Sequence, residues 1–338
     1  MNCQSHSTPP SPSVLTIVVP VFNEVEVLPV FHRRLCAALA NIQLFLEIIY
    51  VDDGSTDDTR TVLQSLHSTD DRVAIIALSR NFGKELAMTA GLDYARGDAV
   101  IVIDADLQDP PELIPEFIRY WHQGYDVVFG QRTSRLGETL LKRSTSYLFY
   151  RLIRRLSRVK IPQDTGDFRL LSRRAVEALR KLREQHRFMK GLFAWIGYAQ
   201  KAVEYQRAPR QGGRTKWNYM RLWNFAVEGI TSFSTAPLKV ATYLGLLTSL
   251  FAFVFGASIL VRTLLYGDPV RGYPSLMVVI LFLGGAQLIS VGLLGEYLAR
   301  VFDEVKNRPL YLIEQHFPST ARDRVKTSSD DSSALRRH

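Results

Sequence analysis

The chain has 338 residues, enough for one large domain or two of ordinary size. Its 42 Lys and Arg residues outnumber 33 Asp and Glu residues, and the net charge of +9 suits nucleic acid, an anionic membrane surface or phosphorylated substrates. The two cysteines, Cys3 and Cys36, argue against a disulfide framework and against a cysteine-based metal site, and they fit a reducing compartment.

The first segment, residues 1–12, is polar and contains no apolar core. A secretory signal peptide needs such a core, so we predict a disordered leader and a chain that starts in the cytosol. Residues 319–338 are similarly polar and of mixed charge, which predicts a tail.

Strands and helices alternate after the leader. Apolar runs rich in Val and Ile predict strands at 14–22, 46–51, 73–78, 99–103 and 126–130, with helices between them. This alternation predicts an α/β fold with a mostly parallel sheet and right-handed crossovers. No Gly-x-Gly-x-x-Gly follows the first strand and no P-loop pattern occurs, which argues against a dinucleotide-binding dehydrogenase and an NTPase.

Acidic residues gather where the predicted strands end. The second strand ends in Asp52-Asp53-Gly54-Ser55-Thr56-Asp57, and the fourth runs into Asp104-Ala105-Asp106, with Gln108 two residues further on. Ligands bind at the carboxyl edge of open α/β sheets, where Asp-x-Asp can hold a hard divalent cation that bridges substrate phosphates. A helix cap and a solvated loop would explain the same acids, so the motif alone leaves both interpretations open.

Four short motifs lie at or after the ends of successive predicted strands. They are Pro20-Val-Phe-Asn-Glu24, Val51-Asp-Asp-Gly-Ser-Thr-Asp57, Arg80-Asn-Phe-Gly-Lys84 and Asp104-Ala-Asp-Leu-Gln-Asp-Pro-Pro-Glu112. Together they resemble the motifs of family-2 glycosyltransferases with the GT-A fold. More narrowly, they are similar to the dolichyl-phosphate mannose synthase and bactoprenol (undecaprenyl-phosphate) glucosyltransferase group, over about residues 14–315.

This resemblance implies a nucleotide-sugar donor and a divalent cofactor, Mg²⁺ or Mn²⁺. Asp104 is implied to lie against the ribose and sugar, while Asp106 and Gln108 are implied to hold the metal against the diphosphate. The residues implied to bind the donor nucleoside are Pro20, Asn23, Glu24 and Asp53. Turn and cap roles are predicted instead for Asp52, Asp57 and Asp58.

Two segments follow the fifth predicted strand. Residues 138–160 mix apolar side chains with Lys and Arg, which predicts a basic amphipathic helix. Such a helix either lies on a membrane surface or packs on the sheet with its charged face in water. Asp164–Leu171 resembles the family segment from which an Asp reaches the reaction centre, so Asp167 joins Asp104 as a catalytic candidate; a helix cap before Arg173 is the alternative.

A basic loop follows a strand predicted at 198–206. Its sequence is Arg207-Ala-Pro-Arg-Gln-Gly-Gly-Arg-Thr-Lys216, and glycines beside guanidinium groups suit a loop that folds over phosphates. The family has a similar Arg-x-x-x-Gly-x-Ser-Lys segment, in which Thr215 replaces Ser here. A solvated basic turn is the alternative. We predict phosphate binding by Arg132, Arg207, Arg210 and Lys216, with Arg210 also at the reaction centre.

From residue 217 the pattern becomes that of a membrane protein. Residues 217–235 predict an amphipathic helix on the bilayer surface, and residues 236–299 predict a transmembrane hairpin. The hairpin has uncharged spans at about 240–261 and 273–295, each above the roughly 20 residues that a span needs. Cations outside the pair place both flanks in the cytoplasm, which makes 300–338 a cytoplasmic tail. Close packing in a homo-oligomer would be favoured by Gly284, Gly285, Gly292 and Gly295.

The combination predicts a membrane-bound inverting glycosyltransferase with a catalytic domain at 13–216. It would move a sugar from a nucleotide donor to a polyprenyl phosphate such as undecaprenyl phosphate, for cell-envelope glycan modification. The reaction would take place at the cytoplasmic face of the inner (plasma) membrane. The two spans and the Asn307-Arg-Pro-Leu-Tyr311 ending resemble bactoprenol glucosyltransferases, which favours glucose from UDP-glucose; mannose and aminoarabinose are alternatives.

Three other functions compete with this hypothesis. A processive polysaccharide synthase usually has a Gln-x-x-Arg-Trp motif and more spans, whereas Gln211–Arg214 is followed by Thr215. An inactive membrane scaffold would not need the acids at 104, 106 and 167. Nucleic-acid binding would explain the positive charge but not the spans, so we predict no nucleic-acid partner.

Overall fold

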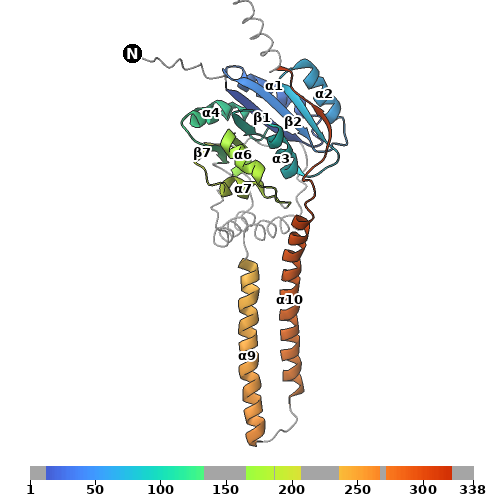
Figure 1. Ribbon diagram of the computed structural model, residues 1–338, viewed down its shortest axis with the longest axis vertical. Helices are drawn as coiled ribbons and strands as arrows, with labels where there is room; N and C mark the ends of the chain where they lie inside the picture. Colours follow the sequence, from blue (N-terminus) through green and yellow to red (C-terminus); the bar gives the residue numbers. More distant parts are fainter. Residues whose placement is uncertain (1–12, 133–164, 186, 207–235, 267–271, 322–338) are drawn as a thin grey trace, which may run out of the picture. The chain divides into compact units, whose positions relative to one another are not determined.

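The computed structural model describes residues 13–132, 165–185, 187–206, 236–266 and 272–321 (Figure 1). The chain divides into two compact units. The first contains residues 1–148, 160–217 and 309–338, and the second contains 149–159 and 218–308. The segment that follows the second apolar helix therefore belongs to the first unit.

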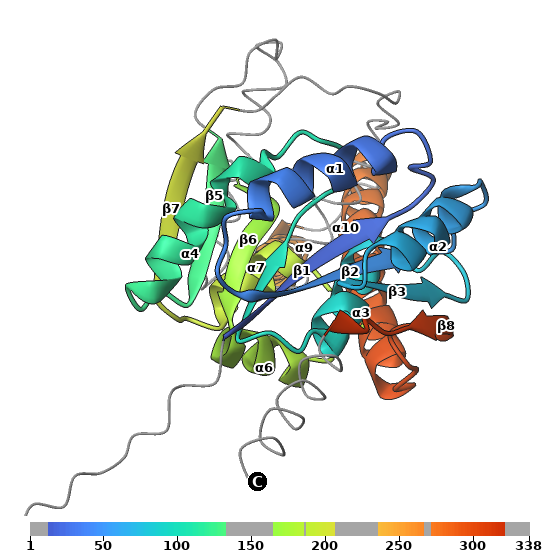
Figure 2. The same cartoon turned by 90° about the horizontal axis from the view of Figure 1, so that it is seen from above.

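An eight-stranded sheet organises the first unit, in the order β7-β5-β6-β4-β1-β2-β3-β8 (Figure 2). Strands β4, β1, β2 and β3 are parallel neighbours, whereas β6 runs antiparallel between β4 and β5. The predicted α/β fold with a mostly parallel sheet is confirmed. The strands are β1 (Val14–Val21), β2 (Phe45–Asp52), β3 (Val73–Leu78), β4 (Ala99–Val102), β5 (Val127–Arg132), β6 (Thr165–Ser172), β7 (Gln200–Tyr205) and β8 (Ile313–Phe317).

Helices cover both faces of this sheet (Figure 2). On one face, α1 (Leu28–Leu39), α2 (Thr59–Thr69) and α4 (Ile114–His122) pack on the strands, with the short η1 (Pro111–Leu113) leading into α4. On the other face lie α3 (Lys84–Tyr94), α6 (Arg173–Lys181) and α7 (Met189–Trp195). Because both faces are covered, the central strands are apolar almost throughout, and this is why their sequence signal is strong.

Residues 309–317 are part of the folded sheet of the first unit, whereas the sequence predicts a tail from residue 300 on. β8 pairs antiparallel with the edge strand β3, and the Ser79 N–H donates to Leu312 O over 2.9 Å. The Tyr311 hydroxyl donates to Asp93 Oδ2 over 2.8 Å, and Glu314 pairs with Arg60 at 2.9 Å. A strand of five residues that pairs, within the described part of the chain, with one edge strand leaves little trace in the sequence.

The second unit contains two long helices, α9 (Ala236–Tyr266) and α10 (Tyr273–Val305). At about 1.5 Å per residue each exceeds the roughly 30 Å of a hydrocarbon core. By length and composition the candidate spans are Ala241–Ser258 and Phe282–Val305. The α10 candidate includes the Glu296–Arg300 ion pair at 3.1 Å, whereas the span predicted at 273–295 ends before it. The helices predicted at 138–160 and 217–235 lie outside the described residues.

Gly91 on α3 sets how closely that helix approaches the sheet. An added Cβ would lie 2.2 Å from Val18 Cγ1 and 3.1 Å from Val51 Cγ2, and β-branched side chains cannot rotate away easily. We therefore expect Gly91→Ala to lower the free energy of unfolding by about 1–3 kcal/mol, despite the better helix propensity of Ala. Thermal unfolding in detergent measures the loss.

Val18→Ala provides the matched control. That substitution removes the 2.2 Å clash and leaves contacts of 3.1 Å to Val51 Cγ2 and 3.3 Å to the Cβ of residue 18, so the double variant should be more stable than the sum of the two single losses predicts. An unchanged melting temperature for Gly91→Ala alone would contradict the close packing of α3.

Candidate functional site

Two carboxylates face each other where β4 ends. Val102 pairs with Arg169 in the antiparallel β4–β6 ladder, so two residues further on Asp104 lies opposite Asp167. The ammonium of Lys84, the first residue of α3, lies between them. Its Nζ is 2.7 Å from Asp104 Oδ2 and 2.5 Å from Asp167 Oδ2. One cation therefore joins the start of α3, the end of β4 and the start of β6.

The charges of this bridge decide its protonation. Burial acts to lower the pKa of Lys84, but the charges of Asp104 and Asp167 outweigh it and raise that pKa above its usual value. Burial alone would raise the pKa of Asp167, yet Lys84 and Lys190 hold it well below its usual range. The lysine is therefore protonated and Asp167 is ionised at neutral pH.

Buried groups beside Asp167 are incompletely paired. Asp167 Oδ1 and Arg169 Nε are buried and have no hydrogen-bond partner among the described residues. Arg169 stacks on the ring of Phe193 at 3.7 Å, and its Nη2 donates to Gly166 O over 2.9 Å. Burial and then the charge of Asp167 raise the pKa of Glu85 to about 7. Unpaired buried atoms and a shifted pKa are typical of functional sites.

Asp53 ties the loop after β2 to the loop before α3. Its carboxylate accepts the N–H of Phe82 over 2.7 Å and the N–H of Gly83 over 3.0 Å. Gly54, with φ of +67°, allows this approach, because an added Cβ there would lie 2.4 Å from Arg80 C. Asp53 thus positions the loop that presents Lys84.

The other residues predicted to bind the donor nucleoside lie at the end of β1, beside the loop after β2. Asn23 Oδ1 accepts the Thr56 N–H over 2.8 Å, and the Glu24 N–H donates to Thr59 Oγ1 over 3.0 Å. Pro20 lies in β1, in register with Val51. The structure therefore gathers the loops after β1 and β2 at the carboxyl edge of the sheet.

The sequence predicts turn and cap roles for three neighbouring acids, and two of them make such contacts, whereas Asp58 precedes α2 without a side-chain cap hydrogen bond. Asp52 Oδ1 accepts the Ser55 N–H over 2.9 Å, and Asp57 Oδ1 accepts the N–H of Thr59, the first residue of α2, over 3.0 Å. Similarly, Ser172 caps α6, with its hydroxyl accepting the Ala175 N–H. The alternative of Asp167 as that helix cap is therefore wrong.

Asp106 and Gln108 share a tight turn after β4. Leu107 between them has φ of +59°, and Asp106 Oδ1 accepts the Gln108 N–H over 3.2 Å. A carboxylate and an amide oxygen are donors that Mg²⁺ and Mn²⁺ accept, and Mg²⁺ completes its shell with water and substrate phosphates. Among the described residues the carboxylates at 104, 106 and 109 do not converge within 4.8 Å. The pair therefore fits a metal shared with a diphosphate.

Arg132 is held by two groups that the sequence analysis did not single out. Its Nε donates to Tyr205 Oη over 3.2 Å, and its Nη2 lies 3.5 Å from Asp109 Oδ1. The Tyr205 hydroxyl donates to Asp109, which is 1% exposed. The other predicted phosphate ligands, Arg207, Arg210 and Lys216, lie outside the described residues.

The sequence analysis also missed Lys84, Glu85 and Arg169 as parts of the site. Lys84 ends the quoted motif Arg80–Lys84, and a cation at the start of a helix that follows a strand end was a usable signal. Glu85 and Arg169 had no recognisable sequence signal, because their proximity to the site depends on the antiparallel pairing of β6 with β4.

Comparison with known proteins fits this geometry. Residues 16–180 match the family described as Glycosyl transferase family 2, and residues 236–301 match the GtrB C-terminal hairpin. Among solved structures, glucosyl-3-phosphoglycerate synthase from Mycobacterium tuberculosis, in complex with Mn²⁺, UDP-glucose and phosphoglyceric acid, is 20% identical with a TM-score of 0.45. That similarity covers 65% of this chain and 78% of the synthase.

Curated relatives match most of the chain. The SfII prophage-derived bactoprenol glucosyl transferase of Shigella flexneri is 49% identical over 89% of this chain and 97% of its own length. An uncharacterized glycosyltransferase of Synechocystis is 53% identical over 88% and 94%. The Escherichia coli K12 prophage bactoprenol glucosyl transferase homolog is 47% identical over 89% and 98%. The family resemblance and enzyme class predicted from the motifs are confirmed: the chain belongs to glycosyltransferase family 2, in the group that carries the GtrB C-terminal hairpin.

Proposed function

We infer that this glycosyltransferase moves glucose from UDP-glucose to bactoprenol phosphate, a polyprenyl phosphate, with inversion at the sugar carbon. The observation that carries this inference is 49% identity to a bactoprenol glucosyl transferase across 97% of that relative. The acidic site at the strand ends and the apolar hairpin give the two substrates separate binding elements. Transfer of mannose or aminoarabinose to the same class of lipid is the runner-up.

The donor would bind at the carboxyl edge of the sheet. The loops that contain Asn23 and Asp53 would receive the nucleoside, and Asp106 with Gln108 would hold Mg²⁺ or Mn²⁺ beside the diphosphate. When bound, the metal supplies positive charge that neutralises the leaving diphosphate. Arg132 lies at the end of β5 and would add a guanidinium to the same anion.

Lys84 adds a second fixed charge to this site. Its side chain is 43% exposed as a whole, and its ammonium would attract an anionic substrate while it holds Asp104 and Asp167 in place. A charge positioned before substrate arrives stabilises the transition state without reorganisation. We assign Lys84 to positioning the two carboxylates and attracting the phosphates.

The acceptor needs little activation. A phosphate monoester has a second pKa of about 6 and is mostly a dianion at neutral pH, so it is already a nucleophile. Asp167, with its pKa held low by Lys84 and Lys190, is a weak base. We infer that Asp167 orients the acceptor or a neighbouring arginine rather than removing a proton.

The hairpin would hold the enzyme at the membrane that contains the lipid acceptor. Cations flank the pair of apolar helices on the outer sides, at Lys239, Lys306 and Arg308. By the positive-inside rule both flanks are cytoplasmic, and the catalytic unit would meet a lipid phosphate at the cytoplasmic face.

Purified protein in membranes that contain undecaprenyl phosphate tests the proposal. We expect UDP-glucose to give labelled lipid faster than other nucleotide-sugars, and we expect a chelator to stop the transfer. Asp106→Asn is the matched variant: it should fold, yet lose metal-dependent donor binding. Faster transfer from a mannose or aminoarabinose donor would favour the runner-up, and no transfer from any donor would contradict the proposal.

Asp167→Asn separates a base from a positioning group. Because Asp167 is ionised throughout, we expect the variant to lose a similar factor, about 10²-fold, at every pH from about 5.5 to about 8.5. If Asp167 were the base, the loss would be largest below about pH 6, where the acceptor monoanion predominates, and would vanish at high pH. The ratio of transfer rates to wild type across this range decides between them.

A further inference from the structure

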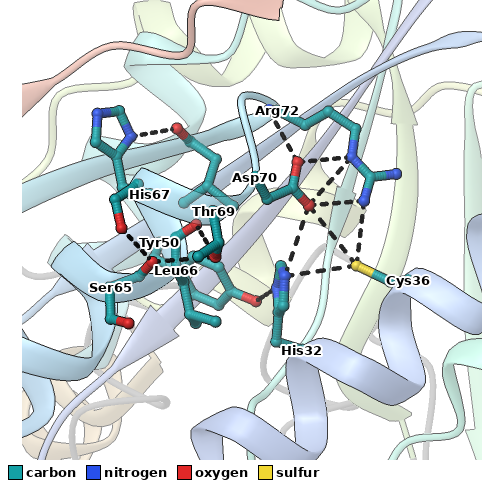
Figure 3. Close-up of polar contacts among 11 residues, drawn as sticks. His32, Cys36, Tyr50, Ser65, Leu66, His67, Thr69, Asp70 and Arg72 are labelled. Carbon is teal, nitrogen blue, oxygen red and sulfur yellow. Dashed lines mark hydrogen bonds and ion pairs between the residues drawn. The ribbon is translucent and has the colours of Figure 1, made fainter.

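A second polar cluster lies between α1 and α2, away from the strand ends that form the site (Figure 3). His32 and Cys36 are four residues apart on α1 and so share one face of that helix. Asp70 follows the last residue of α2 and points toward the same place. The cluster therefore brings together an imidazole and a thiol from α1 and a carboxylate from the residue after α2.

The spacing of these groups resembles one face of a tetrahedron. His32 Nε2 lies 3.5 Å from Cys36 Sγ and 3.6 Å from Asp70 Oδ2, and the sulfur lies 3.8 Å from the same oxygen. Tetrahedral Zn²⁺ bonds of about 2.0–2.3 Å separate neighbouring ligand atoms by about 3.3–3.6 Å. An ion would fit between the three atoms after shifts of a few tenths of an ångström.

The surroundings orient two of these groups as ligands. His32 Nδ1 lies 2.9 Å from the hydroxyl of Tyr50, a fully buried residue of β2. When Nδ1–H donates to that hydroxyl, the lone pair of Nε2 faces Cys36 and Asp70. Arg72 Nε donates to Asp70 Oδ1 over 2.8 Å and lies 3.2 Å from Oδ2, so the guanidinium holds the carboxylate with Oδ2 toward the cluster. Metal-ligating histidines and carboxylates typically have such outer hydrogen bonds.

Arg72 also supplies the cation that now neutralises the cluster. Its Nη2 is 2.6 Å from Asp70 Oδ2 and 3.3 Å from Cys36 Sγ, so an entering ion must displace this nitrogen. The Arg72 side chain is 31% exposed, which gives the displaced nitrogen access to water. Arg72 therefore competes with a metal ion for the same oxygen and sulfur.

We propose that His32, Cys36 and Asp70 form a Zn²⁺ site, with water as the fourth ligand and Arg72 as the competing cation. On binding, Cys36 Sγ, His32 Nε2 and Asp70 Oδ2 each form a bond to the ion. The thiol proton passes to solvent, and no group is oxidised or reduced. The bound ion would pin α1 to α2 at the start of β3, whereas the candidate active site lies beyond the other end of that strand. The proposal is therefore independent of the transfer reaction.

Cobalt(II) titration of the full chain, without a histidine tag and with Cys3→Ser, tests the site. Co²⁺ gives a thiolate charge-transfer absorption only when sulfur is a ligand. We expect this band at one equivalent, and its loss on addition of Zn²⁺. Cys36→Ser should abolish the band, and Arg72→Gln should raise the Co²⁺ affinity several-fold because it removes the competitor.

Thermal unfolding supplies the second measurement. Zn²⁺ should raise the melting temperature of the Cys3→Ser protein but not that of a Cys36→Ser or Asp70→Asn derivative, since an ion that binds only the folded state stabilises it. Sugar transfer by each variant checks that it folds. No cobalt–thiolate band in either the parent or Arg72→Gln would overturn the proposal, as would a band that persists in Cys36→Ser.

Discussion

The contact of one ammonium with two carboxylates fixes the arrangement of the candidate active site. Asp104 and Asp167 lie opposite each other on neighbouring strands, and two like charges at that separation repel unless a cation lies between them. Lys84 supplies that cation from the first turn of α3. Asp53 holds the loop that precedes Lys84. The geometry of this charge cluster therefore depends on the positions of β2, β3, β4 and β6.

This arrangement gives separate tasks to acids that look alike in the sequence. Asp52 and Asp57 hold turns, Asp53 positions the loop before Lys84, and Asp167 is an ionised group with one unpaired buried oxygen. Asp106, among the described acids at the strand ends, is partly exposed, and its Oδ1 accepts the backbone N–H of Gln108. Environment, and not residue type, thus gives these carboxylates their different contacts.

Much of the fold was predictable because doubly covered parallel strands give continuous apolar runs, as in β1 and β3. The antiparallel positions of β6 and β8 were not predictable, because each strand pairs with a strand that is distant in sequence, β4 and β3 respectively. The motifs predicted Asp104 and Asp106, but Lys84 was quoted without a role. The cluster of His32, Cys36 and Asp70 was equally hidden, because its carboxylate comes from the residue after α2, 34 positions beyond Cys36.

The central claim is that Lys84 and Asp167 act as one unit. A double-mutant cycle of sugar transfer with Lys84→Met, Asp167→Asn and the combined variant tests it most directly. If the two residues work together, the double variant should lose little more rate than the worse single variant. Losses that multiply, so that each substitution costs the same factor with or without the other, would contradict the account and show that Lys84 and Asp167 act separately.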